Sequence, residues 1–146
     1  GGVRGVSDEA DVASGKVQLI APIGFLEHAV SESVYAGNAM NRRLFYQYGS
    51  LLDRSPFGHV DQSIGKTVAN GNVGLIAPNV ITTDDIEERT VDGVRMVFHN
   101  TPGTEAPAEM NTWFPDLKAF WAAENITGTI HNIYTLRGAL VRDALE

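Results

Sequence analysis

An Asp92-Gly93 dipeptide between two runs of alternating apolar and polar residues constrains the fold more than any other feature of the sequence. Asp-Gly matches the twist of paired strands, so residues 90–98 are predicted to form a β-hairpin. A second hairpin is predicted from the apolar runs at 110–114 and 119–123, which flank a turn containing proline. The second half of the chain is therefore expected to build a mainly antiparallel or mixed sheet.

The first half of the chain is expected to be more helical. Residues 17–22 are typical of a buried strand, because their apolar run ends at a proline. Helices are predicted at 25–33 and 34–52, the second ending at Gly49, and a C-terminal helix at 129–145. Residues 53–74, rich in Gly, Asn, Ser and Pro, predict a long loop. This order of elements predicts an α/β (α+β) sandwich.

Composition narrows the functional classes. The chain has 146 residues, which is enough for one domain with its own core. The net charge of −7 disfavours binding to nucleic acid or to an anionic membrane surface, since both require clustered Lys and Arg. The absence of cysteine excludes disulfides, thiolate zinc sites and cysteine nucleophiles. No apolar run reaches the roughly 20 residues that a membrane-spanning helix needs.

Two acidic residues, Glu105 and Glu124, are the strongest candidates for metal binding or catalysis. Glu105 lies in a turn enclosed by Pro102, Gly103 and Pro107, and Glu124 follows an apolar run that is expected to be buried. A carboxylate at the end of a buried run needs a partner, and a cation is a suitable one. From residue types alone, the pair could be metal ligands, a general acid and base, or two surface carboxylates.

Three segments give the sequence a family resemblance. It resembles the metallo-β-lactamase-fold alkylsulfatases, which hydrolyse alkyl sulfate esters such as dodecyl sulfate. The similarity runs along nearly the whole chain and is densest at residues 34–43, 103–110 and 136–143. The resemblance implies an αββα sandwich that this chain completes only in part, as the central piece of a catalytic domain spanning residues 1–146.

The resemblance also implies a metal centre. In that family a His-x-His-x-Asp-His run precedes a Gly-Gly pair, and this chain starts at Gly1-Gly2, so we expect those ligands upstream in a longer protein. A further histidine ligand is expected beyond Glu146. Glu105 and Glu124 fall on the family's two glutamate ligands, Glu105 on one zinc ion and Glu124 bridging two. This stretch by itself is therefore expected to be inactive.

Other site residues are implied near the C-terminus. The resemblance places Arg137, and less strongly Arg142, on the sulfate group, for which the guanidinium fork is well shaped. The alternative to this sulfate-binding role is that each arginine lies on the protein surface and pairs with a nearby acidic residue. His131 could orient a metal ligand or protonate the leaving group, or simply pack. The family's homodimer would form through a region mostly outside this chain.

The sequence leaves several alternative interpretations open. Glu109 competes with Glu105 for the ligand role, but it falls where a strand is expected to start. His59 and Asp61 imitate a His-x-Asp metal motif, yet they lie in the long loop, which we expect to line a substrate channel. At the level of function, the alternatives are a hydrolase of another ester or thioester in the same superfamily, and a non-catalytic stretch without metal.

Overall fold

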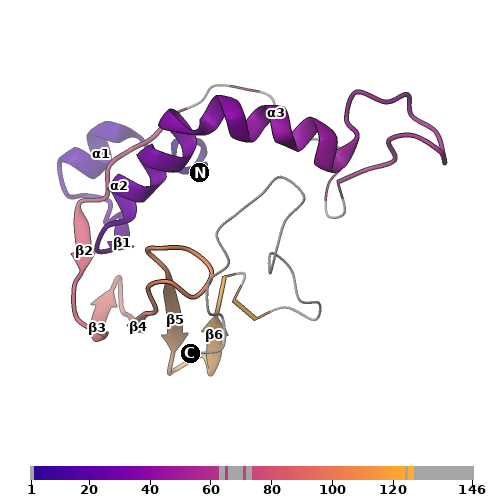
Figure 1. Cartoon of the computed structure of the whole chain (residues 1–146). Coiled ribbons are helices and arrows are strands. Elements are labelled where there is room, and N and C mark those ends of the chain that lie inside the picture. Colours follow the sequence, from indigo (N-terminus) through magenta and orange to yellow (C-terminus); the bar gives the residue numbers. More distant parts are fainter. Residues whose placement is uncertain (1, 63–64, 66–70, 72–73, 124, 127–146) are drawn as a thin grey trace. The chain divides into compact units, whose positions relative to one another are not determined.

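Both predicted hairpins are present in the computed structural model, which describes residues 2–62, 65, 71, 74–123 and 125–126 (Figure 1). Strands β3 (Ile86–Val91) and β4 (Val94–Asn100) pair antiparallel. Asp92 and Gly93 between them have φ angles of 51° and 78°. Positive φ at both central residues is what a type I′ turn requires, so the prediction of this hairpin is confirmed.

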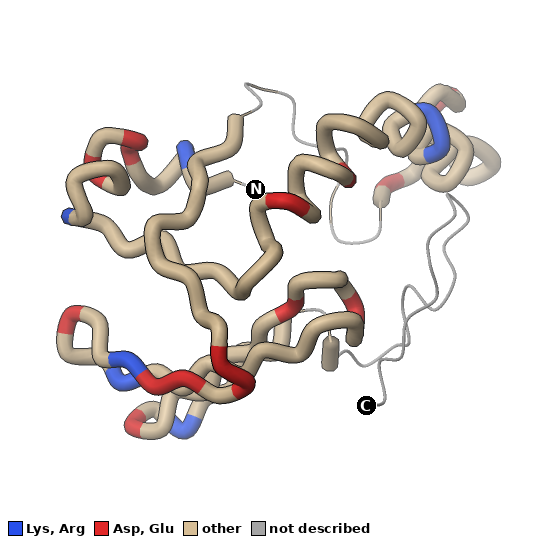
Figure 2. The backbone as a smooth tube through the Cα atoms, turned by 60° about the vertical axis from the view of Figure 1, so that its left-hand side comes forward, with Lys and Arg blue, Asp and Glu red and all other residues tan. Residues whose placement is uncertain are grey.

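The second hairpin extends the same sheet. Strands β5 (Met110–Phe114) and β6 (Ala119–Trp121) pair antiparallel, and β5 also pairs with β4. The result is a four-stranded sheet in the order β3-β4-β5-β6. Its hairpin β3–β4 carries acidic and basic residues close together (Figure 2), including a Glu87–Arg89 ion pair. The two partners of this ion pair are half-buried and lie two residues apart on the same strand.

The described residues divide into two compact units. One contains 2–28, 74–123 and 125–126, and the other contains 29–62, 65 and 71. Besides the four-stranded sheet, the elements in chain order are the 3₁₀ turn η1 (Val3–Gly5), α1 (Glu9–Ala13), β1 (Ile20–Pro22), α2 (Phe25–Val30), the π-helical turn η2 (Ser31–Tyr35), α3 (Gly37–Tyr48) and β2 (Val80–Thr82).

In the first unit, a buried threonine joins two sheets. Strands β1 and β2 form a parallel pair, with Ala21 opposite Ile81. Thr82 at the end of β2 has no exposed surface, and its hydroxyl donates a hydrogen bond to Asn100 Oδ1 at 2.9 Å. Asn100 in turn donates to the Asp84 carbonyl at 2.7 Å. The buried apolar side chains of this unit are Val12, Ala21, Ile76 and Phe98.

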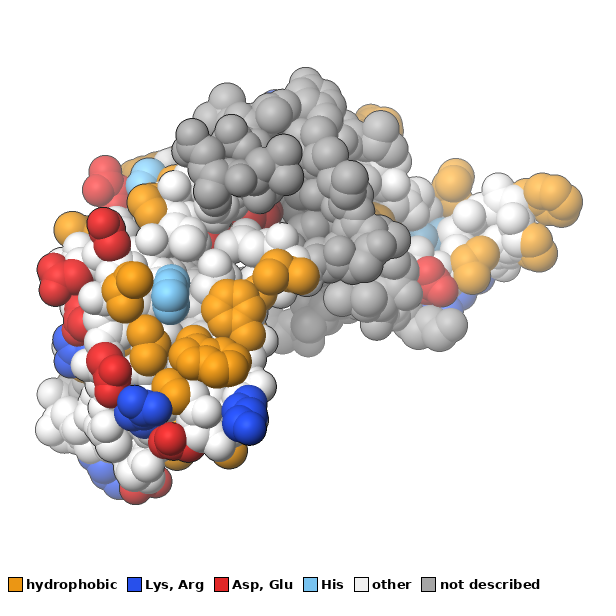
Figure 3. Space-filling view, turned by 90° about the horizontal axis from the view of Figure 1, so that it is seen from below, with side chains coloured by type: hydrophobic (Ala, Val, Ile, Leu, Met, Phe, Trp, Pro, Cys, Tyr) orange, Lys and Arg blue, Asp and Glu red, His pale blue; other side chains and the backbone are white. Residues whose placement is uncertain are grey.

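One face of the four-stranded sheet carries a group of apolar side chains that are partly exposed to solvent. The strand register places Ile86, Val97, Trp113 and Phe120 on the same face, together with His99. Figure 3 shows hydrophobic side chains gathered around a histidine on this part of the molecule. Ile86 is 61% exposed and Phe120 is 48% exposed.

Strand β6 corrects one of the sequence-based expectations. The run that leads to Glu124 was expected to be buried, but all three residues of β6 are exposed, and Trp121 keeps 67% of its surface. The reason is position, because β6 is the edge strand of the sheet and has a neighbour on one side only. The burial argument for a cation beside Glu124 is therefore wrong, and the metal assignment of Glu124 rests on the family resemblance.

The second unit is built around α3. The predicted helix at 34–52 is confirmed for Gly37–Tyr48, and Gly49 ends it in the left-handed conformation with φ 61°. Residues 31–35 form a π-helical turn instead of continuing α2. His59 lies in the loop after α3 and is buried, with 6% of its surface exposed. Its Nδ1 donates to the Tyr48 carbonyl at 2.8 Å, which satisfies a carbonyl at the end of the helix.

Gly58 permits the tight turn of this loop, and its replacement is therefore predicted to lower the stability of the protein. A Cβ added at Gly58 would lie 2.1 Å from the Asp53 carbonyl oxygen, which also accepts a hydrogen bond from the His59 N–H at 3.1 Å. We expect Gly58→Ala to lower the free energy of unfolding by about 2–3 kcal/mol, because the clash is with backbone. The measurement is urea-induced unfolding of the full-length protein.

Gly37→Ala is the matched control in the same unit. A Cβ at Gly37 meets nothing within 4 Å, and the position opens α3. Alanine in place of glycine in a helix is expected to stabilise the protein by about 0.5–1 kcal/mol. Equal stability of the two variants would contradict the close turn at residues 53–59.

Other sequence-based predictions met mixed results. The strand predicted at 17–22 is present but starts at Ile20, and the helix at 25–33 is regular only to Val30. Strand β2 and helix α1 were not predicted. The helix expected at 129–145 lies outside the described residues. None of the helices in the described part of the chain has the length and apolar character needed to cross a bilayer.

Candidate functional site

Glu105 lies on a turn between β4 and β5 that is fastened by backbone hydrogen bonds. The Thr101 N–H donates to the Glu109 carbonyl at 3.0 Å, which closes the base of the turn. Inside it, the Gly103 N–H donates to the Ala106 carbonyl at 2.9 Å, and Gly103 has φ 82°. The left-handed conformation at Gly103 needs glycine, so the sequence signal of Pro and Gly around Glu105 did mark a fixed turn.

The position of Glu105 suits a ligand role. Its side chain is half-buried although it lies on a loop. Carboxylate oxygens bind zinc well, and a turn held at both ends reduces the freedom that a ligand loses on binding. Within the described residues there is no group of three or more His, Asp or Glu side chains able to hold a metal. A half-buried carboxylate on a fixed turn is chemically suited to contribute one ligand of a metal centre, and this role of Glu105 stays a prediction.

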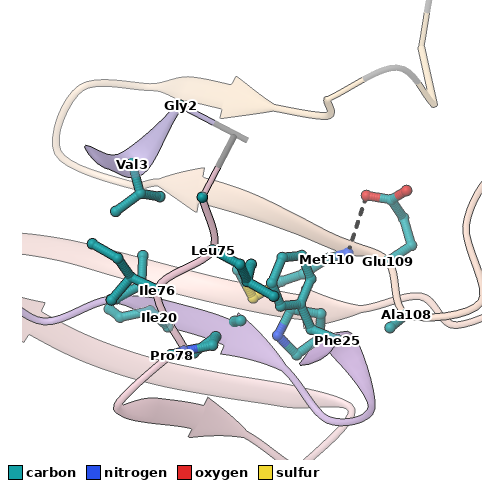
Figure 4. A pocket seen from close by; sticks show the side chains of 14 residues that line it. Gly2, Val3, Ile20, Phe25, Leu75, Ile76, Pro78, Ala108, Glu109 and Met110 are labelled. Atoms are coloured by element: carbon teal, nitrogen blue, oxygen red, sulfur yellow. Dashed lines mark hydrogen bonds between the residues drawn. The ribbon is translucent and has the colours of Figure 1, made fainter. Parts of the chain in front are cut away.

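Glu109, the rival ligand, lies at the other end of the turn. Its Oε1 accepts a hydrogen bond from the Met110 N–H at 3.2 Å, drawn as the dashed line in Figure 4. The bond occupies one carboxylate oxygen at the start of β5. The preference for Glu105 over Glu109 as the ligand stays a prediction from the family resemblance.

An apolar pocket of about 240 Å³ lies next to the turn, within the first unit (Figure 4). Its wall includes Ile20, Phe25 and Ile76, and the end of the Glu105 turn contributes Ala108 and Met110. The Glu109 carboxylate is drawn pointing away from these apolar side chains. The pocket is thus suited to an apolar group and lies beside the carboxylate-bearing turn.

A pair of asparagines connects the turn to the chain after β6. Asn111 is buried, with 9% of its surface exposed, and its Nδ2 donates to Thr101 Oγ1 at 3.3 Å. Its Oδ1 accepts a hydrogen bond from Asn125 Nδ2, also at 3.3 Å. Neither asparagine could be identified from the sequence, because an amide side chain gives no signal until the strand register shows what it faces.

The other predicted site residues cannot be placed. Glu124, His131, Arg137 and Arg142 all lie outside the described residues. Of the five residues implied by the family resemblance, Glu105 alone lies within the described part of the chain, and its proximity to the others stays a prediction. His59 is described, and its hydrogen bond to the end of α3 gives it a structural role in place of the metal role considered for it.

Comparisons with known proteins give a consistent result. No family model matches the sequence. An alkyl/aryl-sulfatase of Saccharomyces cerevisiae, BDS1, is 53% identical over 143 residues, which are 98% of this chain and 22% of that protein. A linear primary-alkylsulfatase of Pseudomonas sp. is 51% identical over 145 residues, or 99% of this chain and 22% of the relative.

The structural comparison agrees with the sequence comparison. The stereoselective inverting sec-alkylsulfatase Pisa1 of Pseudomonas sp. superposes with a TM-score of 0.89 at 48% identity. The match covers 98% of this chain and 23% of that structure, and a double mutant of the same enzyme gives the same TM-score at 49% identity. The chain thus spans less than a quarter of the length of each of these proteins.

Proposed function

The chain belongs to the alkylsulfatases over the part of those enzymes that it spans, and from this we propose that the protein containing it hydrolyses alkyl sulfate esters to an alcohol and inorganic sulfate. Its mixed α/β fold is that of the matched sec-alkylsulfatase, which is of the metallo-β-lactamase type. The observation that carries the proposal is the 51–53% identity of nearly the whole chain to alkylsulfatases, and the fixed, half-buried turn that presents Glu105 is compatible with it.

The proposed reaction needs a metal-activated water, donors to the sulfate group and a proton for the leaving alcohol. Two zinc ions, when bound, would supply an activated water and polarise the ester. Glu105 and Glu124 would be among the residues that hold the ions, since carboxylate oxygens bind zinc well. Arg137, assisted by Arg142, would hold the sulfate oxygens through paired N–H donors. His131 would deliver a proton to the leaving alcohol oxygen.

The substrate's alkyl part is proposed to use apolar surface near the turn. The pocket beside Ala108 and Met110 is lined mainly by apolar side chains, which suits a hydrocarbon chain. We further propose that residues 1–146 form the central part of the catalytic domain and that the whole protein is a homodimer. Neither nucleic acid nor a membrane segment enters this function.

Removing metal tests the proposal directly. We expect a strong chelator to lower sulfate release from dodecyl sulfate by the full-length protein at least about 100-fold, and added zinc to restore it. The measurement is inorganic sulfate released per minute, paired with elemental analysis for zinc. Undiminished activity in demonstrably metal-free protein would contradict the metal mechanism.

A carboxylic ester of the same chain length is the control substrate. The proposed anion-binding arginines recognise sulfate, so dodecyl acetate should be turned over far more slowly than dodecyl sulfate. Equal turnover of the two esters would favour a superfamily hydrolase of other esters over a sulfatase.

A further inference from the structure

Two asparagine side chains bridge segments that are distant along the chain. Asn111 lies on β5 with its side chain buried, and its amide is bonded on both ends. One end donates to Thr101 Oγ1, and the other accepts from Asn125 Nδ2. The bonded series Thr101–Asn111–Asn125 therefore links the turn before β5 with the chain that follows β6.

Thr101 is the residue that anchors the Glu105 turn. Its N–H donates to the Glu109 carbonyl, and its own carbonyl accepts from the Thr104 hydroxyl at 2.8 Å. A shift of Thr101 would thus move both ends of the turn together. Asn111 fixes Thr101 from the adjacent strand, where β4 and β5 hold the backbone in register.

The far end of the series has two features that cost free energy. Ala123 has φ 47°, a left-handed conformation that costs a residue with a Cβ roughly 1–2 kcal/mol. Asn125 Oδ1 is buried and has no hydrogen-bond partner among the residues that the structure describes. Such features persist where the surroundings enforce them, and they are concentrated at functional sites.

These two costly positions flank residue 124 in the sequence. Asn125 is held there from both its backbone and its side chain, because its N–H donates to the Ala122 carbonyl at 2.9 Å and its Nδ2 donates to Asn111. The chain next to Glu124 is therefore tied, through Asn111, to the turn that carries Glu105.

We propose that Asn111 and Asn125 are positioning residues, which hold the segments bearing Glu105 and Glu124 in the register needed to bind one pair of metal ions. This inference rests on the proposed function. Metal ligands must be placed to within a few tenths of an ångström, and mutation of the groups that orient them typically lowers metal affinity by about 10- to 100-fold.

The test compares two identical substitutions in the first unit of the full-length protein. Thr101→Val removes the hydroxyl that accepts from Asn111, and Thr82→Val removes the buried hydroxyl that donates to Asn100. Each substitution removes a side-chain hydrogen bond while the side chain keeps nearly the same shape. We expect Thr101→Val and Asn125→Ala to weaken zinc binding about 10- to 100-fold, measured by competition with a coloured chelator.

The controls separate positioning from general stability. Thr82→Val should lower the melting temperature of the metal-free protein at least as much as Thr101→Val does, because Thr82 is fully buried, yet keep wild-type zinc affinity. Thr101→Ser retains the hydroxyl and should restore zinc affinity. Wild-type affinity in both Thr101→Val and Asn125→Ala, or an equal loss in Thr82→Val, would overturn the positioning role.

A zinc titration of the wild-type protein separates failure of the proposed metal-dependent function from failure of the positioning role alone. If the unaltered full-length protein binds no zinc, the proposed metal-dependent function fails, and the positioning role fails with it. If the wild type binds two zinc ions and all four variants bind them equally well, the positioning role alone fails.

Discussion

Glu105→Gln in the full-length protein is expected to reduce kcat/KM for dodecyl sulfate by about 1000-fold and to lower bound zinc from two ions to one. Glutamine keeps the size and shape of the side chain and leaves the backbone bonds of the turn intact. What it removes is the anionic oxygen that is proposed to bind zinc. The measurements are steady-state kinetics and elemental analysis of the same preparation.

Glu109→Gln is the matched control, four residues further along the same turn. Glu109 Oε1 accepts from the Met110 N–H, and a glutamine side-chain carbonyl can accept the same bond. We expect two zinc ions per chain and nearly unchanged kinetics. Loss of zinc and activity in Glu109→Gln, with both retained in Glu105→Gln, would show that the ligand assignment belongs to Glu109.

The parts of the fold that the sequence predicted well are those specified by local chemistry. Asp92-Gly93 imposes positive φ at two successive positions, and few alternatives to a hairpin accept that. Gly49 similarly ends α3 by taking a left-handed conformation. In each case neighbouring residues decide the geometry, so no information about the rest of the chain is needed.

The parts that could not be predicted depend on contacts between distant residues. Strand β2 pairs with β1 across a separation that includes the whole second unit, and a three-residue strand carries too little pattern to reveal this. Trp121 is apolar but exposed because β6 is an edge strand, which sequence does not show. Helix α1 had a weak signal in Asp8, Glu9 and Asp11, acids favoured at a helix start.

The candidate site likewise has parts that the local sequence predicts and parts that depend on contacts between distant residues. The Pro and Gly residues around Glu105 marked a fixed turn, and the turn is present. Asn111 and Asn125 were missed, because their hydrogen bonds depend on the register of β4 against β5 and on the path after β6. The remaining ligands and anion-binding residues came from family resemblance alone, so variants must test them.

Arg137→Lys is expected to reduce kcat/KM for dodecyl sulfate by about 100- to 1000-fold, mainly by raising KM. Lysine keeps the positive charge, but its compact ammonium cannot donate two parallel bonds to a sulfate. Because sulfate is part of both substrate and product, inhibition by inorganic sulfate should weaken in parallel. A residue that merely stabilised the fold would not alter these two constants together.

Arg142→Lys supplies the comparison, since it makes the same change five positions further along the chain. We expect a smaller loss, because the family resemblance places Arg142 less firmly on the sulfate, and little change in inhibition by sulfate. Zinc content should stay at the wild-type level in both variants, since neither side chain is an expected metal ligand. A larger effect at Arg142 than at Arg137 would transfer the main anion contact to Arg142. Wild-type kinetics in both variants would mean that the sulfate group is held by other donors.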